Sequence, residues 1–228
     1  NLKHLLIAGF VALGLSSCDG FLNVMPSDAL TTENAINNID DVNAVLNGVY
    51  QSLLDEGYYG NDLIARAEMG GDDVQPTMEG KSRTDNWYRF MYRVNNSPSG
   101  LWYYPYKAIS RANTLIDVIE SGKIEASEEL NIAKGEALAV RALCHFNLTI
   151  TYGYPYQKDN GASYGVPLVL DVPTASDMPS RSSVAQCYAA IEQDLEDALD
   201  YLTCFFSFVQ VFPIKEIQPA PLLRLLHG

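Results

Sequence analysis

Four long stretches of the chain repeat apolar residues with the period of an α-helix. The first is the clearest, because Val42, Leu46, Val49 and Leu53 follow one another at i, i+4, i+7 and i+11. The same period predicts helices over about residues 40–55, 99–121, 127–152 and 183–202. A helix with one apolar stripe is stable in water only when another element covers that stripe. We therefore predict an all-α fold in which helices pack in pairs and are joined by long ordered loops.

Polar residues mark where these helices begin. Asp40 or Asp41 can cap the first helix, and Ser127 can cap the third. The pattern Ser183-x-x-Gln186 is a capping box that opens the fourth.

Two segments between the helices lack a helical period. Residues 57–100 are rich in Gly, Asp, Asn and aromatic residues, so we expect a long ordered loop region, and such loops often carry function. The apolar segment 166–170 contains Pro167 and is predicted to be at most a short edge strand.

The N-terminus has the layout of a lipoprotein signal peptide. A basic start containing Lys3 precedes an apolar run from Leu5 to Leu15, which as a helix would span only about 16 Å of a hydrocarbon core about 30 Å thick. Ser16, Ser17 and Cys18 then form a lipobox. We expect residues 1–17 to be removed and Cys18 to carry the lipid that anchors the protein to a membrane. The alternative is a plain secretory signal followed by an incidental cysteine.

Charge and cysteine content exclude several functions. The net charge of −13 argues against nucleic acid or anionic lipid as a partner. Besides Cys18, the cysteines are Cys144, Cys187 and Cys204, without paired spacing, and those at helical positions are expected to be buried free thiols. The 3 histidines are scattered, so we expect no metal site and no cofactor.

The region 57–100 holds the residue types that bind sugars. Sugar rings stack on aromatic faces, and their hydroxyl groups bond to carboxylate, amide and guanidinium groups. The candidate ligand-binding residues are Asp72, Asp73, Arg83, Asn86, Trp87 and Tyr88. The alternative is that Trp87 and Tyr88 pack the loop onto the helices.

The sequence does not predict an enzyme. Adjacent Asp72 and Asp73 would point to opposite sides of an extended loop, so they make a poor acid and base pair for a glycoside hydrolase. Arg141 and His145, four residues apart on one helix, are expected to form buried hydrogen bonds between helices. No catalytic residue is assigned.

Residues 203–228 differ in character from the rest. Cys204–Phe212 is apolar without alternation, and three prolines follow. We predict that the natural reading frame is lost near Thr203 and that 203–228 is a non-native tail. The alternative is a genuine segment that packs on a partner or on missing sequence.

Several motifs, in this order, resemble the SusD/RagB family of lipoproteins, which are the nutrient-binding partners of SusC-type TonB-dependent transporters. The motifs are Cys18-Asp19-Gly20-Phe21-Leu22-Asn23, Asn47-Gly48-Val49-Tyr50, Tyr106-x-x-Ile109-x-Arg111-Ala112-Asn113, Glu136-Ala137-x-Ala139-x-Arg141-Ala142-x-x-His145-Phe146, Gly165-Val166-Pro167-Leu168 and Arg181-Ser182-Ser183-Val184.

The resemblance covers about residues 18–202, and it implies the N-terminal part of a longer SusD-like helical domain. Its implied fold is a set of tetratricopeptide-like helix pairs whose loops build a ligand face. Its implied function is a lipid-anchored protein at the outer-membrane surface that binds oligosaccharide and delivers it to a SusC-like TonB-dependent transporter. A branch of the family implies peptide cargo instead.

Overall fold

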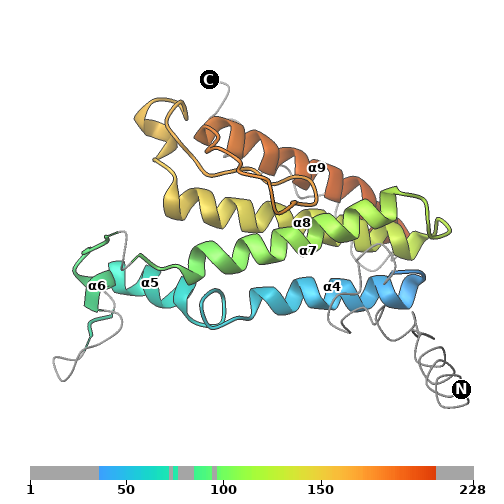
Figure 1. The fold of residues 1–228 in the computed structure, drawn as a ribbon, viewed down its shortest axis with the longest axis horizontal. Helices are drawn as coiled ribbons and strands as arrows, with labels where there is room; N and C mark the ends of the chain where they lie inside the picture. The colour runs from blue at the N-terminus through green and yellow to red at the C-terminus, as the bar shows by residue number, and fades with distance from the viewer. Residues whose placement is uncertain (1–35, 72–73, 77–84, 94–96, 209–228) are drawn as a thin grey trace, which may run out of the picture. The chain divides into compact units, whose positions relative to one another are not determined.

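The computed structural model describes residues 36–71, 74–76, 85–93 and 97–208, with side chains as far as Leu202 (Figure 1). The helices of the described residues belong to the second of two compact units, Asn37–Gly228. The predicted signal peptide and its lipidation site, Cys18, lie outside the described residues.

The four predicted long helices are present. They are α4 (Ile39–Leu53), α7 (Gly100–Glu120), α8 (Glu128–Tyr152) and α9 (Val184–Phe208). Helix α7 packs between α4 and α8, and α8 packs on α9, each neighbour running antiparallel to the next (Figure 1). The described ranges contain no strand. The all-α class with tetratricopeptide-like helix pairs is therefore confirmed.

Two of the three predicted caps are confirmed. The Ser127 hydroxyl accepts a hydrogen bond from the Leu130 N–H at 3.2 Å. Ser183 and Gln186 form the reciprocal capping box, with bonds of 2.9 and 3.2 Å. The prediction that Asp40 or Asp41 caps α4 was wrong.

The N-cap of α4 is Asn38, whose side chain accepts from the Asp41 N–H at 2.9 Å. The Asp41 carboxylate instead reaches back and accepts from the Asn37 N–H at 2.9 Å. Asp41 thus lies in the first turn and bonds to the residue before the N-cap, because the helix begins one residue earlier than the apolar stripe suggests.

The expectation that residues 57–100 lack helices was wrong. Helix α5 spans Asp62–Gly70, and the single turn α6 spans Asp85–Tyr88. Helix α5 buries none of its residues, so it carries no apolar stripe from which a period could be recognised. Its residues, including Leu63, Ala65, Arg66 and Met69, are nevertheless strong helix formers.

Arg141 lies at the centre of the bundle and connects four segments. Its guanidinium donates two bonds to the buried carboxylate of Asp194 on α9, at 2.6 and 2.8 Å. The same group donates to the Asn113 side chain on α7 at 2.9 Å and to the Leu170 carbonyl at 2.8 Å. The buried charge is tolerable because the guanidinium is paired with a carboxylate through two hydrogen bonds and donates two more to neighbouring groups.

The segment 166–171 crosses α7 and α8 as extended chain without forming a strand. Most of its backbone bonds go to side chains: the Val169 N–H donates to His145 Nε2 at 3.3 Å, and the Asn113 amide donates to the Val169 and Asp171 carbonyls at 3.0 and 2.7 Å. An isolated bridge between Tyr164 and Ser183 lies beside it. The predicted buried hydrogen bonding between helices is confirmed for Arg141, whereas His145 bonds to the crossing segment and not to another helix.

Other buried polar contacts tie α4 to its neighbours. Arg111 on α7 donates to the Gly48 carbonyl at 2.6 Å and to the Ser52 hydroxyl at 2.7 Å. The two cysteines with described side chains, Cys144 and Cys187, are free and buried as predicted. Burial raises the pKa of the Cys144 thiol to about 12, so this thiol stays protonated.

Helix α9 continues past the predicted boundary at Leu202 as far as Phe208. It lies close to α8 at Gly135, where an added Cβ would come within 3.0 Å of the Leu202 and Tyr201 side chains. The assignment of residues 203–228 as a non-native tail stays a prediction.

No helix in the described ranges has the length and apolar character needed to cross a membrane.

The Arg141–Asp194 pair gives a first prediction. In Asp194→Ala the guanidinium stays buried without its carboxylate, which we expect to lower the free energy of unfolding by about 3–5 kcal/mol. Urea denaturation followed by circular dichroism measures this. The control is Asp85→Ala, which breaks the pair between Asp85 and Arg89, whose side chains are 43% and 55% exposed, and should leave the midpoint unchanged. Equal effects of the two substitutions would contradict the central role of Arg141.

His145 gives a second prediction. Burial, with a smaller effect of nearby Arg141, lowers the pKa of His145 from its ordinary 6.5 to about 4. Between these values the unfolded chain binds a proton that the folded chain does not. The folded state should therefore lose about 3 kcal/mol of stability from this residue as the pH falls from 6.5 to 4.

The measurement is the pH dependence of the unfolding free energy in the unsubstituted chain and in His145→Gln, which retains an acceptor but cannot be protonated. The difference between the two proteins should fall by about 3 kcal/mol over that range. A difference independent of pH would show that His145 is not buried as a neutral imidazole.

Candidate functional site

The candidate site is built on the short helix α6 and the turn that follows it. Trp87 is only 5% exposed and anchors α6 in the protein. The turn is closed by hydrogen bonds from the Phe90 N–H to the Trp87 carbonyl at 3.2 Å and from the Met91 N–H to the Asn86 carbonyl at 2.8 Å. Phe90 adopts a left-handed φ of 53°, which is unfavourable for a bulky residue and is most often retained at functional sites.

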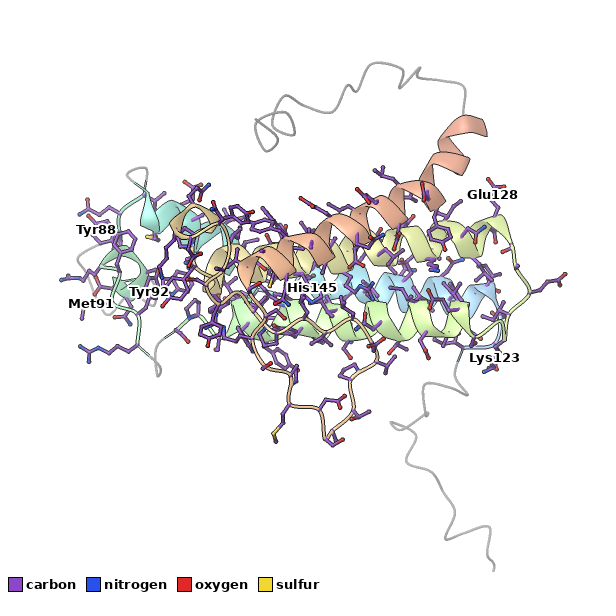
Figure 2. All side chains as sticks on the ribbon, turned by 90° about the horizontal axis from the view of Figure 1, so that it is seen from above. Tyr88, Met91, Tyr92, Lys123, Glu128 and His145 are labelled. Atoms are coloured by element: carbon purple, nitrogen blue, oxygen red, sulfur yellow. The ribbon has the colours of Figure 1, made fainter. Side chains whose placement is uncertain are left out.

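This turn places large apolar side chains on the surface. Phe90 is 64% exposed, and Met91 and Tyr92 are also exposed, while Tyr88 is half-buried. Figure 2 shows Tyr88, Met91 and Tyr92 gathered at one end of the bundle, far from Lys123 and Glu128 at the other end. We call Tyr88, Phe90, Met91 and Tyr92 the aromatic end. Exposed large apolar residues grouped in this way are typical of a surface that binds a ligand or a partner protein.

Arg66 on α5 brings a charge to the aromatic end. Its guanidinium carbon lies 5.8 Å from the centre of the Tyr92 ring, within the range of a cation–π interaction. Its Nε is buried and has no hydrogen-bond partner among the described residues. The guanidinium is thus held in place by a ring face and has one buried N–H group that is left unpaired within the described residues.

Tyr152 at the end of α8 supports the same region. Its hydroxyl donates to the Pro98 carbonyl at 2.6 Å, and its ring lies 5.1 Å from that of Trp102. Burial raises the pKa of Tyr152 to about 12, with a small opposing effect from the positive charge of Arg66. Tyr152 therefore remains a neutral hydrogen-bond donor that joins α8 to the start of α7.

The predicted site residues are only partly described. Asp72, Asp73 and Arg83 lie outside the described residues. Asn86, Trp87 and Tyr88 come together on α6, with the Trp87 ring facing inward and the other two half-buried. The burial of Trp87 agrees with the alternative that this ring packs the loop onto the helices. The assignment of these six residues to ligand binding stays a prediction.

Sequence reasoning missed Arg66, Phe90, Met91 and Tyr92. The last three directly follow the predicted Trp87 and Tyr88, so the concentration of large apolar side chains in residues 87–92 was a usable signal. Arg66 carried no such signal, because only the folding of α5 against the turn brings it to Tyr92.

The arrangement is suited to binding. Ring faces and a thioether offer apolar contact, and Arg66 and Asn86 offer hydrogen bonds, which together fit a sugar ring with its hydroxyl groups. In the described part of the chain, no three His, Cys, Asp or Glu side chains are grouped so that they could hold a metal ion.

Known proteins are similar to this chain in sequence and in fold. A family model described as "Starch-binding associating with outer membrane" matches residues 20–215. A SusD-like protein of Formosa agariphila is 25% identical over 185 residues, which is 75% of this chain and 33% of that protein.

Two crystal structures from Bacteroides vulgatus are also similar. A SusD superfamily protein has a TM-score of 0.69 and 39% identity, and the match covers 73% of this chain and 38% of that chain. A SusD-like carbohydrate binding protein has a TM-score of 0.63 and 25% identity, with 73% and 36% covered. The chain thus spans 33–38% of the length of these relatives. It belongs to the SusD-like family, as the sequence motifs predicted.

Proposed function

We propose that this chain is part of a cell-surface lipoprotein that binds oligosaccharide and delivers it to a SusC-like TonB-dependent transporter. Lipidated Cys18 would hold the protein at the outer membrane. The family description, which names starch binding and association with the outer membrane, supports the carbohydrate ligand and the place at the outer membrane. The carbohydrate-binding relative from Bacteroides vulgatus supports the ligand class.

The observation that carries the proposal is the aromatic end with Arg66 beside it. Phe90 and Tyr92 offer exposed ring faces, onto which the C–H face of a pyranose can stack. Arg66 lies against Tyr92 and offers donors to the hydroxyl groups at the rim of the same sugar. The left-handed turn at Phe90 holds these rings outward before any ligand arrives.

The proposed role is binding without catalysis. The two buried groups best suited to acid and base chemistry already serve the fold: Asp194 is paired with Arg141, and His145 Nε2 accepts the Val169 N–H. The low pKa of His145 keeps its imidazole neutral, with that acceptor occupied. These groups are held inside the bundle, away from the exposed rings of the aromatic end.

Titration calorimetry with maltoheptaose and laminarihexaose tests the proposal. Tyr92→Ala removes one stacking face and the partner of Arg66, and we expect about tenfold weaker binding. The matched control is Tyr164→Ala, which removes an exposed tyrosine outside the aromatic end and should leave the affinity unchanged.

Equal affinities of the two variants would contradict the aromatic end as the site. Absence of heat with both sugars, together with binding of an unstructured peptide, would replace oligosaccharide with peptide as the cargo.

A further inference from the structure

A hollow, separate from the aromatic end, lies where the chain passes from α8 to α9. It is bounded by the short 3₁₀-helix η2 (Tyr156–Lys158) and by the first turns of α9. Its volume is about 320 Å³, at the lower end of the range for small-molecule sites. The lining residues are Tyr156, Gln157, Ala185, Tyr188, Ala189 and Glu192. We call this hollow the η2–α9 pocket.

Two tyrosine rings form adjacent walls of the pocket. The Tyr156 and Tyr188 rings are 5.9 Å apart and nearly perpendicular, at 81°. Ala185 and Ala189 lie one helical turn apart on α9 and leave room between the rings, because neither side chain extends beyond Cβ. Tyr188 is supported from behind by Phe146, at a ring distance of 6.4 Å.

The backbone fixes the first ring in position. Gly161 has a φ of +77°, and a Cβ there would lie 2.8 Å from both the Tyr156 ring and the Ala185 nitrogen. The Gly161 N–H donates to the Tyr156 carbonyl at 3.0 Å, and the Gly161 carbonyl accepts from the Ala185 N–H at 2.9 Å. The loop that carries Tyr156 is therefore tied to α9, and the pocket is preformed.

The polar groups of the pocket are available to a ligand. Gln157 and Glu192 are exposed, and neither has a hydrogen bond or ion pair with another described residue. The hydroxyl groups of Tyr156 and Tyr188 are likewise unpaired within the described ranges. The pocket thus combines two ring faces with a carboxylate, an amide and two hydroxyl groups.

We propose that the η2–α9 pocket is a second carbohydrate site that binds one neutral pyranose unit. A ring of that size stacks on Tyr188 and abuts Tyr156, while Gln157 and Glu192 bond to its hydroxyl groups. The Glu192 carboxylate, on a chain of net charge −13, disfavours an acidic sugar. The inference rests on the proposed function only in taking oligosaccharide as the ligand class.

The pocket and the aromatic end are built from different elements. One uses η2 and α9, the other α5 and α6, yet both lie at the end of the bundle where α7 begins and α8 ends (Figure 1). Two separate sites at one end of the bundle raise the avidity for a polymer that can reach both.

Two-dimensional NMR of the nitrogen-labelled chain tests the second site. Maltoheptaose should shift the amide signals of Ala189 and Glu192 as well as that of Tyr92. We expect Tyr156→Ala to weaken the response at Ala189 about tenfold and to leave the response at Tyr92 unchanged. Tyr164→Ala, in the same loop but outside the pocket, should change neither.

Three further variants guard against loss of folding. Ala189→Phe at an exposed helical position fills the pocket without removing a ring, and it should abolish the response at Glu192. Glu192→Ala should weaken binding in the pocket, whereas Glu196→Ala, one turn further along the exposed face of α9, should not.

The outcomes separate this inference from the proposed function. Shifts at Tyr92 with none at Ala189 would overturn the second site and leave the proposed function standing. Shifts at Ala189 alone would support the second site and contradict the aromatic end. If tetramethylammonium shifts Ala189 and the sugar does not, the pocket is a cation site formed by two rings and a carboxylate, and the inference is wrong.

Discussion

The buried guanidinium of Arg141 is the interaction on which the rest of the structure depends. It joins α8, which carries it, to Asn113 on α7, to Asp194 on α9 and to the Leu170 carbonyl of the crossing segment. Each of these groups would be costly to bury alone, and each is satisfied only when the helices are in one register. Apolar stripes determine that these helices pack, and Arg141 determines which residues face one another.

Both candidate sites depend on this core through short chains of contacts. Asn113, His145 and Arg141 hold the crossing segment 166–171 in place. The residues just before it, 161–165, are hydrogen-bonded to the start of α9 beside the η2–α9 pocket. At the other site, Asn147 on α8 donates to the hydroxyl groups of Tyr58 and Tyr59, at 2.7 and 3.0 Å, and so fixes the link from α4 to α5. The loops and turns that carry the surface rings are therefore tied by hydrogen bonds to the long helices.

The sequence predicted what depends on local pattern. The stripe in Val42, Leu46 and Val49 located α4, and Ser127 and Ser183 located the starts of α8 and α9, because stripes and caps are properties of a few neighbouring residues. The pattern could not reveal α5, which has no buried face, or tell that Trp87 packs inward beside exposed Phe90. Arg66 beside Tyr92, and Tyr156 beside Tyr188, are separated by 26 and 32 residues in sequence, so only the fold brings them together.

We infer that this helical bundle presents carbohydrate-binding rings at the end where α8 finishes. Hydrogen–deuterium exchange of the chain with and without maltoheptaose tests it most directly. We expect slower amide exchange in residues 85–93 and 155–160 when the sugar is present. We expect no change in the turn between α7 and α8, which lies at the opposite end with Lys123 and Glu128 (Figure 2). Unchanged exchange in both segments, or protection confined to that opposite turn, would contradict the account.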